Sequence, residues 1–202
     1  MFFVNYATVI DPLLKGLRAY AIAFSGVKAE DNVLDVCCGT GDQVYHCAEA
    51  GIGAVGIDLD PDMLKLAKKD RRKNVLGNAS FYLADARNLP FADESFDYAF
   101  ISFALHEKER VARDEIIAEM KRVVRHGGVL VFIDFQTPLP RNLMAYFVRV
   151  IEFLAGKNHN RYFQDYIEHG GLGQILNKNQ LAPEKIAYLY NELITIVTAK
   201  NP

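Results

Sequence analysis

The sequence lacks three features that would assign the protein to a special class. Neither sign of charge is in excess, since 23 Lys and Arg stand against 25 Asp and Glu and the formal net charge is −2. There are only three cysteines, and no stretch approaches the ~20 uncharged apolar residues that a membrane helix needs. These absences argue against a nucleic-acid-binding surface, a disulfide framework and a membrane span.

The cysteines and the first residues also bear on location. Cys37, Cys38 and Cys47 are an odd number and suit a reducing compartment. The start of the chain, MFFV, is apolar but has no basic segment before it, so we expect no signal peptide. We predict a cytoplasmic protein that acts on a small molecule and not on nucleic acid. A stable membrane insertion is not expected, a transient membrane contact stays open, and the oligomeric state is not set by the sequence.

Strand and helix patterns alternate along the chain, which predicts an α/β fold with a mostly parallel sheet. Strands are expected at 32–36, 54–58, 80–83, 96–102 and 129–134, with helices at 11–25, 41–50, 61 to about 73, and 109–124. After Pro138 and Pro140, helices are expected at 141–155, 162–169 and 172–179, before a strand pair at 185–190 and 193–200.

The 202 residues fit one domain. We divide this domain into an N-terminal helical cap (1–30), a cofactor-binding core (31–136), a helical insertion (141–180) and the terminal strand pair (184–200).

The most informative stretch is VLDVCCGTGD at 33–42, which predicts the end of a strand, a glycine turn and the start of a helix. Asp35 lies at the end of this strand, and Gly39 and Gly41 form the turn. Asp58 ends the next strand, and Asp85 follows the third. Ligands of open α/β sheets bind at the carboxyl ends of the strands. Glycines there let the backbone approach a ligand, and carboxylates can accept hydrogen bonds from ribose hydroxyls or an amino group.

A nicotinamide dinucleotide is the main rival ligand for such a turn. Its fingerprint, G-x-G-x-x-G, requires a third glycine where this chain has Val44. Asp42 would also repel a pyrophosphate at the start of the helix. A ligand with a sulfonium and an ammonium group is instead favoured by the acids Asp35 and Asp42. The residues therefore point to S-adenosyl-L-methionine and to methyl transfer.

From 32 to 134 the sequence resembles the class I S-adenosylmethionine-dependent methyltransferases. The glycine turn is similar to their first motif, with Cys37 in place of the usual first glycine. Residues 56–64 are similar to the second motif, 85–97 to the third, and 120–128 to the helix and turn before the fifth strand. The resemblance implies a Rossmann-like, doubly wound, mostly parallel seven-stranded sheet that ends in a C-terminal antiparallel strand pair.

The resemblance also implies a cofactor-binding set and no metal site. The implied set is Asp35, Cys37, Gly39, Gly41, Asp58, Leu59, Met63, Asp85, Ala86 and Ser102. Within it, Asp35 and the two glycines would hold the methionine part. Asp58 would bind the ribose, Leu59 would lie against the adenine, and Asp85 would bind the adenine amino group.

Two segments are similar to one branch of the family. CCGT at 37–40 and ISFAL at 101–105 are similar to the enzymes that methylate a ring carbon of ubiquinone or menaquinone precursors. The chain is short for this branch, and His106 stands where the branch usually has arginine. The resemblance implies a small aromatic or apolar acceptor, with a quinol ring carbon as its most specific form.

Transfer from a sulfonium mainly requires alignment of the reactants and exclusion of water. A phenol or hydroquinone acceptor can also need a base, and His106, just after the fourth strand, is our candidate. The alternative is a histidine that caps a helix or faces solvent. Six aromatic side chains of the later helices are expected to line an apolar acceptor pocket or to form core: Tyr146, Phe147, Phe153, Tyr162, Phe163 and Tyr166.

The sequence is also compatible, to different degrees, with three other functions. A protein that binds S-adenosylmethionine without catalysis, as a regulator or an assembly partner, is the main alternative. Thiol chemistry at Cys37 and Cys38, such as metalloid methylation, competes with a simple packing role for these residues. A nucleic-acid methyltransferase is disfavoured by the net charge and by SFAL at 102–105, where an Asn/Asp-Pro-Pro-Tyr/Phe motif is expected.

Overall fold

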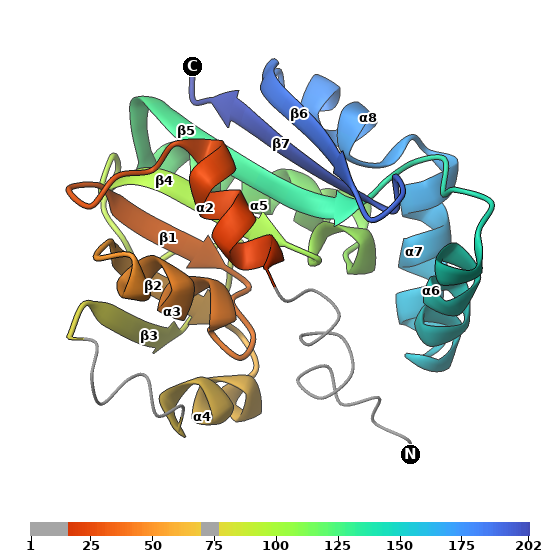
Figure 1. Cartoon of the computed structure of the whole chain (residues 1–202), viewed down its shortest axis with the longest axis horizontal. Helices are drawn as coiled ribbons and strands as arrows, with labels where there is room; N and C mark the ends of the chain where they lie inside the picture. Colours follow the sequence, from red (N-terminus) through yellow and green to blue (C-terminus); the bar gives the residue numbers. More distant parts are fainter. Residues whose placement is uncertain (1–15, 70–76) are drawn as a thin grey trace.

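A seven-stranded sheet, in the order β3-β2-β1-β4-β5-β7-β6, forms the centre of the protein (Figure 1). The computed structural model describes residues 16–69 and 77–202. The strands are β1 (Asn32–Val36), β2 (Gly53–Asp58), β3 (Ala79–Leu83), β4 (Phe96–Ser102), β5 (Val124–Phe135), β6 (Pro183–Leu189) and β7 (Ile194–Lys200). Pairing is parallel from β3 to β5 and antiparallel from β5 through β7 to β6. This confirms the predicted sheet and its terminal strand pair.

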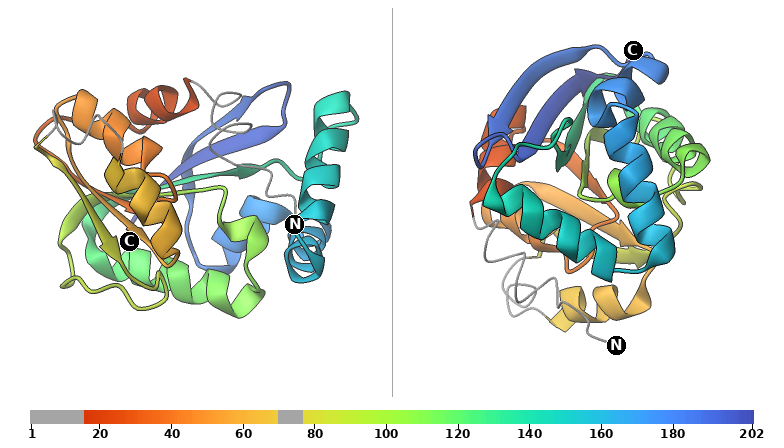
Figure 2. Two further views of the ribbon diagram at one scale, coloured as in Figure 1. Left: turned by 90° about the horizontal axis from the view of Figure 1, so that it is seen from below. Right: turned by 90° about the vertical axis from the view of Figure 1, so that its right-hand side faces the viewer.

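Helices cover both faces of the sheet. The described helices are α2 (Leu17–Ser25), α3 (Asp42–Glu49), α4 (Pro61–Lys69), the 3₁₀ turn η2 (Leu105–Glu107), α5 (Arg110–Val123), α6 (Leu143–Leu154), α7 (Lys157–Glu168) and α8 (Gly171–Lys178). In Figure 2, α2 and α3 lie on one face and α5 lies on the other. The pair α6 and α7 stands beyond the carboxyl ends of the parallel strands (Figure 1). This pair therefore flanks the edge at which a ligand is expected.

The apolar core follows from the strand sequences. The last four residues of β1 and the first six of β7 are buried, as expected for strands that are covered on both faces. The outer strand β6 lies at the edge of the sheet and is mostly exposed, including its apolar residues Ile186 and Tyr188. Burial is therefore deepest in the middle of the sheet, next to the strand ends that carry the predicted site.

Three helix boundaries differ from their predictions. The expected helices 11–25 and 61 to about 73 are described only as α2 and α4, because residues 1–15 and 70–76 lie outside the described part of the chain. α7 begins at Lys157, five residues before the predicted start. Its first turn is polar, KNHNR, and carries no apolar periodicity that would reveal a helix.

The junction of α5 and β5 also differs from its prediction. The sequence places a glycine turn at 126–128 and the strand at 129–134, whereas β5 begins at Val124 directly after α5. The pairing with β4 jumps from Phe96–Val124 to Tyr98–Val129, so the glycines lie in an irregularity within the strand. A Cβ on Gly128 would lie 2.7 Å from the carbonyl oxygen of Asp97, which explains the glycine.

We predict that Gly128→Ala lowers the free energy of unfolding by about 1–3 kcal/mol, because the added methyl group overpacks this junction. Urea unfolding would measure the loss. Gly53→Ala is the matched control, since the nearest atom to its new Cβ, Oδ1 of Asn32, is 3.9 Å away. Equal unfolding midpoints for the two variants would contradict the prediction.

Candidate functional site

A cavity of about 700 Å³ opens at the carboxyl ends of β1, β2 and β4. Eight of the ten residues predicted to bind the cofactor line it: Cys37, Gly39, Asp58, Leu59, Met63, Asp85, Ala86 and Ser102. The structure thus brings together side chains that are far apart in the sequence. The other two predicted residues, Asp35 and Gly41, lie behind the wall of the cavity and do not line it.

The turn after β1 has a left-handed backbone. Cys37, Gly39 and Gly41 have φ angles of 59°, 53° and 78°. Glycine adopts this conformation without cost, whereas Cys37, which replaces the usual first glycine, carries some strain. Gly41 also has a packing role, because a Cβ there would lie 2.4 Å from Cε1 of Phe81. Gly41 therefore allows the turn to pack against Phe81 without itself lining the cavity.

Asp58 is held in place by two backbone amides. Its Oδ2 accepts a hydrogen bond from Gly39 N at 2.7 Å, and its Oδ1 accepts one from Asp60 N at 2.8 Å. A carboxylate has about four acceptor positions, so each oxygen retains capacity for a ligand hydroxyl. This geometry suits the predicted contact with a ribose.

Asp85 is oriented by its neighbour Arg87. The guanidinium donates to both carboxylate oxygens, with Nη2 2.7 Å from Oδ2 and Nε 3.1 Å from Oδ1, and the backbone N of Arg87 donates to Oδ1 at 2.9 Å. The hydrogen bonds and charge of Arg87 lower the pKa of Asp85. Asp85 is therefore an ionised acceptor on the cavity wall, as a contact with an amino group requires.

Two polar atoms of the cavity wall are buried without a hydrogen-bond partner among the described residues. They are Nη1 of Arg18 and Oγ of Ser102. Buried polar groups are rarely left unpaired, so these two atoms require a partner such as a water, an ion or a ligand. The guanidinium of Arg18 also lies over the ring of Phe103, 5.9 Å from its centroid. An anionic group of a ligand could accept a hydrogen bond from the guanidinium of Arg18.

Arg18 was not among the residues predicted from the sequence. The signal that could have identified it is its isolation, because it is the only charged residue of α2, LRAYAIAFS. Glu107 and Lys108 also line the cavity and were not predicted from the sequence. Glu107 and Lys108 directly follow His106 and form an ion pair at 2.5 Å.

The comparisons with known proteins agree with this site. Residues 33–128 match the family described as "Methyltransferase domain". The demethylmenaquinone methyltransferase of Paenarthrobacter aurescens is 40% identical over 161 residues, 76% of this chain and 61% of that protein. The ubiquinone/menaquinone biosynthesis C-methyltransferase of Citrifermentans bemidjiense is 36% identical over 149 residues, 69% of this chain and 62% of that protein. The chain carries an S-adenosylmethionine-dependent methyltransferase domain.

The fold agrees with this assignment. A methyltransferase from Aquifex aeolicus, described as dependent on S-adenosylmethionine, superposes with a TM-score of 0.72 at 19% identity and covers 98% of each chain. At this identity the superposition establishes the Rossmann-like methyltransferase fold alone. The chain spans about three fifths of the length of the two curated relatives named above. Among the described helices of the methyltransferase domain, none is long and apolar enough to cross a membrane.

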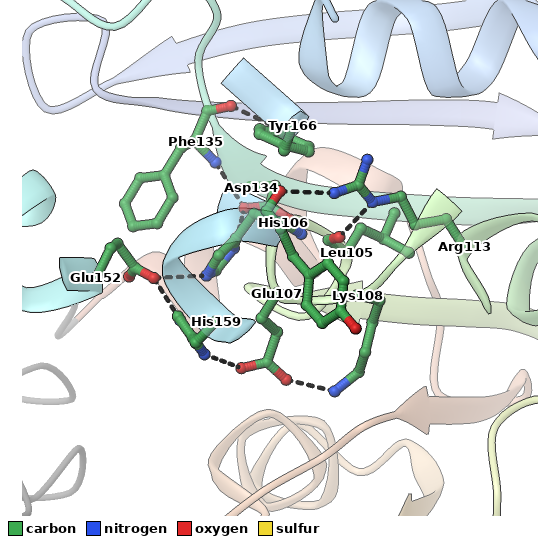
Figure 3. A network of polar contacts seen from close by, with 11 residues as sticks. Leu105, His106, Glu107, Lys108, Arg113, Asp134, Phe135, Glu152, His159 and Tyr166 are labelled. Carbon is green, nitrogen blue, oxygen red and sulfur yellow. Dashed lines mark hydrogen bonds and ion pairs between the residues drawn. The ribbon is translucent and has the colours of Figure 1, made fainter. Parts of the chain in front are cut away.

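His106 lies next to the cofactor cavity but does not line it. Only 1% of the residue is exposed, and its Nδ1 lies 2.6 Å from Oδ1 of Asp134 (Figure 3). Burial would lower the pKa of His106, but the charge and hydrogen bond of Asp134, with smaller effects of Glu152 and Glu107, raise it to about 9. The ring is therefore mostly protonated at neutral pH.

The three cysteines, two in the glycine turn and one on α3, are poor nucleophiles in this environment. Burial is the main effect that raises the pKa of Cys37 and of Cys47 to about 12, and it raises that of Cys38 further. The thiolate is the reactive form of cysteine, and it is scarce at neutral pH in these three residues. This favours the packing role over thiol chemistry.

The six later aromatics divide into three groups. Tyr162 lines the cavity, as predicted for an acceptor pocket. Phe163 and Tyr166 are buried core residues that face His106. Tyr146, Phe147 and Phe153 are exposed on α6, so among the described residues they belong to neither predicted environment.

Asp35 gives a testable pH dependence. Burial is the largest effect on its carboxyl and raises the pKa from 3.8 to about 7, against the opposing charge of Arg18. At a pH between 3.8 and about 7, Asp35 is protonated in the folded chain and ionised in the unfolded chain. The contribution of Asp35 to the free energy of unfolding therefore falls as the pH rises through this range.

We expect Asp35→Asn to remove this loss. Relative to the natural chain, the free energy of unfolding of the variant should gain about 3–4 kcal/mol between pH 4 and 7.5. Urea unfolding of the ligand-free proteins at both pH values would measure the change. A difference between the two proteins that does not vary with pH would rule out a raised pKa.

Proposed function

We propose that the protein transfers a methyl group from S-adenosyl-L-methionine to a small aromatic or apolar acceptor. The observation that carries this proposal is the cavity, which is lined by Arg18 and by the oriented carboxylates of Asp58 and Asp85. A cation suits the methionine carboxylate, and the two acids suit the ribose hydroxyls and the adenine amino group. The family and fold described above support the same ligand.

The residues of the cavity would bind and orient the reactants and would not themselves activate the methyl group. The bound sulfonium provides an activated methyl group. Arg18, Asp58 and Asp85 would fix its two ends, and the apolar surface of Phe103 and Tyr162 would exclude water around the acceptor. Positioning of this kind can lower a barrier by about 7–11 kcal/mol. Phe103 has a left-handed backbone (φ 52°), a strained conformation of the sort found at functional sites.

A quinol ring carbon is our most specific proposal for the acceptor. It rests on the two relatives, whose names refer to demethylmenaquinone and to ubiquinone/menaquinone biosynthesis. Cytoplasmic location and a transient membrane contact likewise stay predictions. A contact would be compatible with α6, on which Leu143, Tyr146, Phe153 and Leu154 are each more than 60% exposed.

The direct test is binding of S-adenosylmethionine by calorimetry, followed by detection of its demethylated product with a panel of reduced quinones and simpler phenols. Binding with turnover of at least one acceptor is expected. Binding without turnover of any acceptor would favour the non-catalytic alternative. No binding at millimolar concentration would refute the proposed function.

Arg18→Ala should weaken the binding of S-adenosylmethionine about 10- to 100-fold, because a charge-assisted hydrogen bond contributes roughly 1.5–3 kcal/mol. Calorimetry would measure the dissociation constant. Arg149→Ala, on the exposed side of α6, removes the same charge from the surface and should leave binding unchanged. Equal losses in the two variants would indicate a general electrostatic effect instead of a contact.

The base role of His106 stays a prediction with its own test. This role requires the ring to lose a proton, although its pKa is raised to about 9, and to reach a cavity that it does not line. If His106 moves the acceptor proton, His106→Ala should lower turnover by about 10²–10⁴-fold with little change in cofactor affinity. Single-turnover rates and calorimetry separate the two effects. His106→Asn is the second variant, because it keeps a polar group beside Asp134. Unchanged turnover in both variants would exclude the role.

A further inference from the structure

A cluster of three side chains lies beside the cofactor cavity and has no role in holding the methyl donor. His106 comes from η2, Glu152 from the end of α6 and His159 from the first turn of α7 (Figure 3). One ligand atom of each residue lies within 4.8 Å of the other two. His106 and Glu152 are almost fully buried, and the side chain of His159 is 25% exposed. The cluster therefore has one side open to solvent.

The two histidines present Nε2 to the same carboxylate. Nε2 of His106 lies 3.7 Å from Oε2 of Glu152, and Nε2 of His159 contacts that same oxygen. A separation of 3.7 Å is too long for an N–H···O hydrogen bond. It is close to the ~3.4 Å expected between two ligands that each lie about 2.1 Å from a tetrahedral ion.

A second carboxylate lies near the other nitrogen of each histidine, within hydrogen-bond distance for His106 and at an ion-pair distance for His159. Asp134 Oδ1 lies 2.6 Å from Nδ1 of His106, and Glu107 Oε2 lies 3.5 Å from Nδ1 of His159. Histidines that bind metals almost always donate their other N–H to a carboxylate, carbonyl or water, which fixes the ring and its tautomer. The ring of His106 is thus prepared to offer Nε2 as a ligand. Nε2 of His159 contacts Oε2 of Glu152 directly and would exchange this contact for the ion.

The charges of the cluster require compensation. Asp134 and Glu152 have side chains that are 1% and 4% exposed. The nearby Lys108 pairs with Glu107, and the guanidinium of Arg113 donates to Asp165 and to backbone carbonyls. Two buried carboxylates therefore need two positive charges. Two protonated imidazoles or one divalent ion would supply them.

We propose that His106, Glu152 and His159 bind a divalent transition-metal ion of the zinc type. Two imidazoles and one carboxylate are a ligand set that zinc accepts, and three protein ligands leave a position for water or a ligand oxygen. The site is distinct from the cofactor contacts. The ion would withdraw Nε2 of His106 from proton transfer, so its role would be that of a ligand and not of a base.

The position of the site suggests what the ion does. It would join α6 and α7 to η2. This link would add to the hydrogen bonds by which Tyr166 of α7 and His106 of η2 are already attached to β5. Tyr162 on α7 and Glu107 on η2 both line the cavity. A bound ion would therefore fix the acceptor side of the cavity without touching the methyl donor.

The test is a metal titration of the full chain after treatment with a chelator. Cobalt(II) is added and followed by its visible absorption, and zinc is then added in competition. We expect one equivalent to bind, with a rise in the thermal unfolding temperature. His159→Ala should weaken binding by more than about 100-fold, and Glu107→Gln by about 10-fold. His159 is partly exposed at a helix start, so its loss is the substitution best tolerated by the fold.

Glu152→Gln is the second ligand variant, and His126→Ala is the control, since its side chain is 79% exposed on the far end of β5. The control should bind metal as the natural chain does. Equal binding by His159→Ala and the control, no stoichiometric binding, or a thiolate charge-transfer band that places the ion on cysteine would each overturn the proposal. Because the readout needs neither methyl donor nor acceptor, it is independent of the proposed methyl transfer.

Discussion

The carboxylate of Asp58 connects the two strands on which the cofactor site depends. It accepts the backbone N–H of Gly39, and Cys38 N donates to the carbonyl oxygen of Ile57 at 2.8 Å. These bonds attach the turn after β1 to the end of β2. The turn can come this close because Gly56 leaves no Cβ, which would otherwise lie 2.8 Å from Sγ of Cys38. The remaining walls of the cavity are arranged around this fixed turn.

A second polar centre supports the opposite side of the cavity. Asp134 accepts hydrogen bonds from the backbone N and the ring of His106, and Tyr166 donates to the carbonyl oxygen of Phe135 at 2.9 Å. These contacts join β5, η2 and α7. Buried charges of this kind are costly unless they are paired, so the segment that carries them is held in one arrangement. One side of the cavity is thus built on the strand ends of the sheet, and the other side includes Glu107 of η2 and Tyr162 of α7.

Most of the fold was accessible from the sequence, because short apolar strands and glycine turns are local signals. Two residues of the cavity wall were accessible for the same reason: Asp58 ends β2 and Asp85 follows β3, and parallel strands bring their ends to one edge. Errors arose where the signal was not local. The polar first turn of α7 has no periodicity, and the irregular β4–β5 pairing is set by the contact of Gly128 with the backbone of Asp97.

The sequence by itself determined the sheet, the family and eight of the residues that line the cavity. Only the tertiary structure showed that Asp35 lies behind the cavity and that Arg18 faces it from a distant helix. Only the tertiary structure also placed Glu152 and His159 beside His106. In the sequence, His106 and Glu152 are 46 residues apart. The physical reason is that periodicity and strand ends report on neighbours in sequence, whereas burial and charge pairing depend on which helices the packed core brings together.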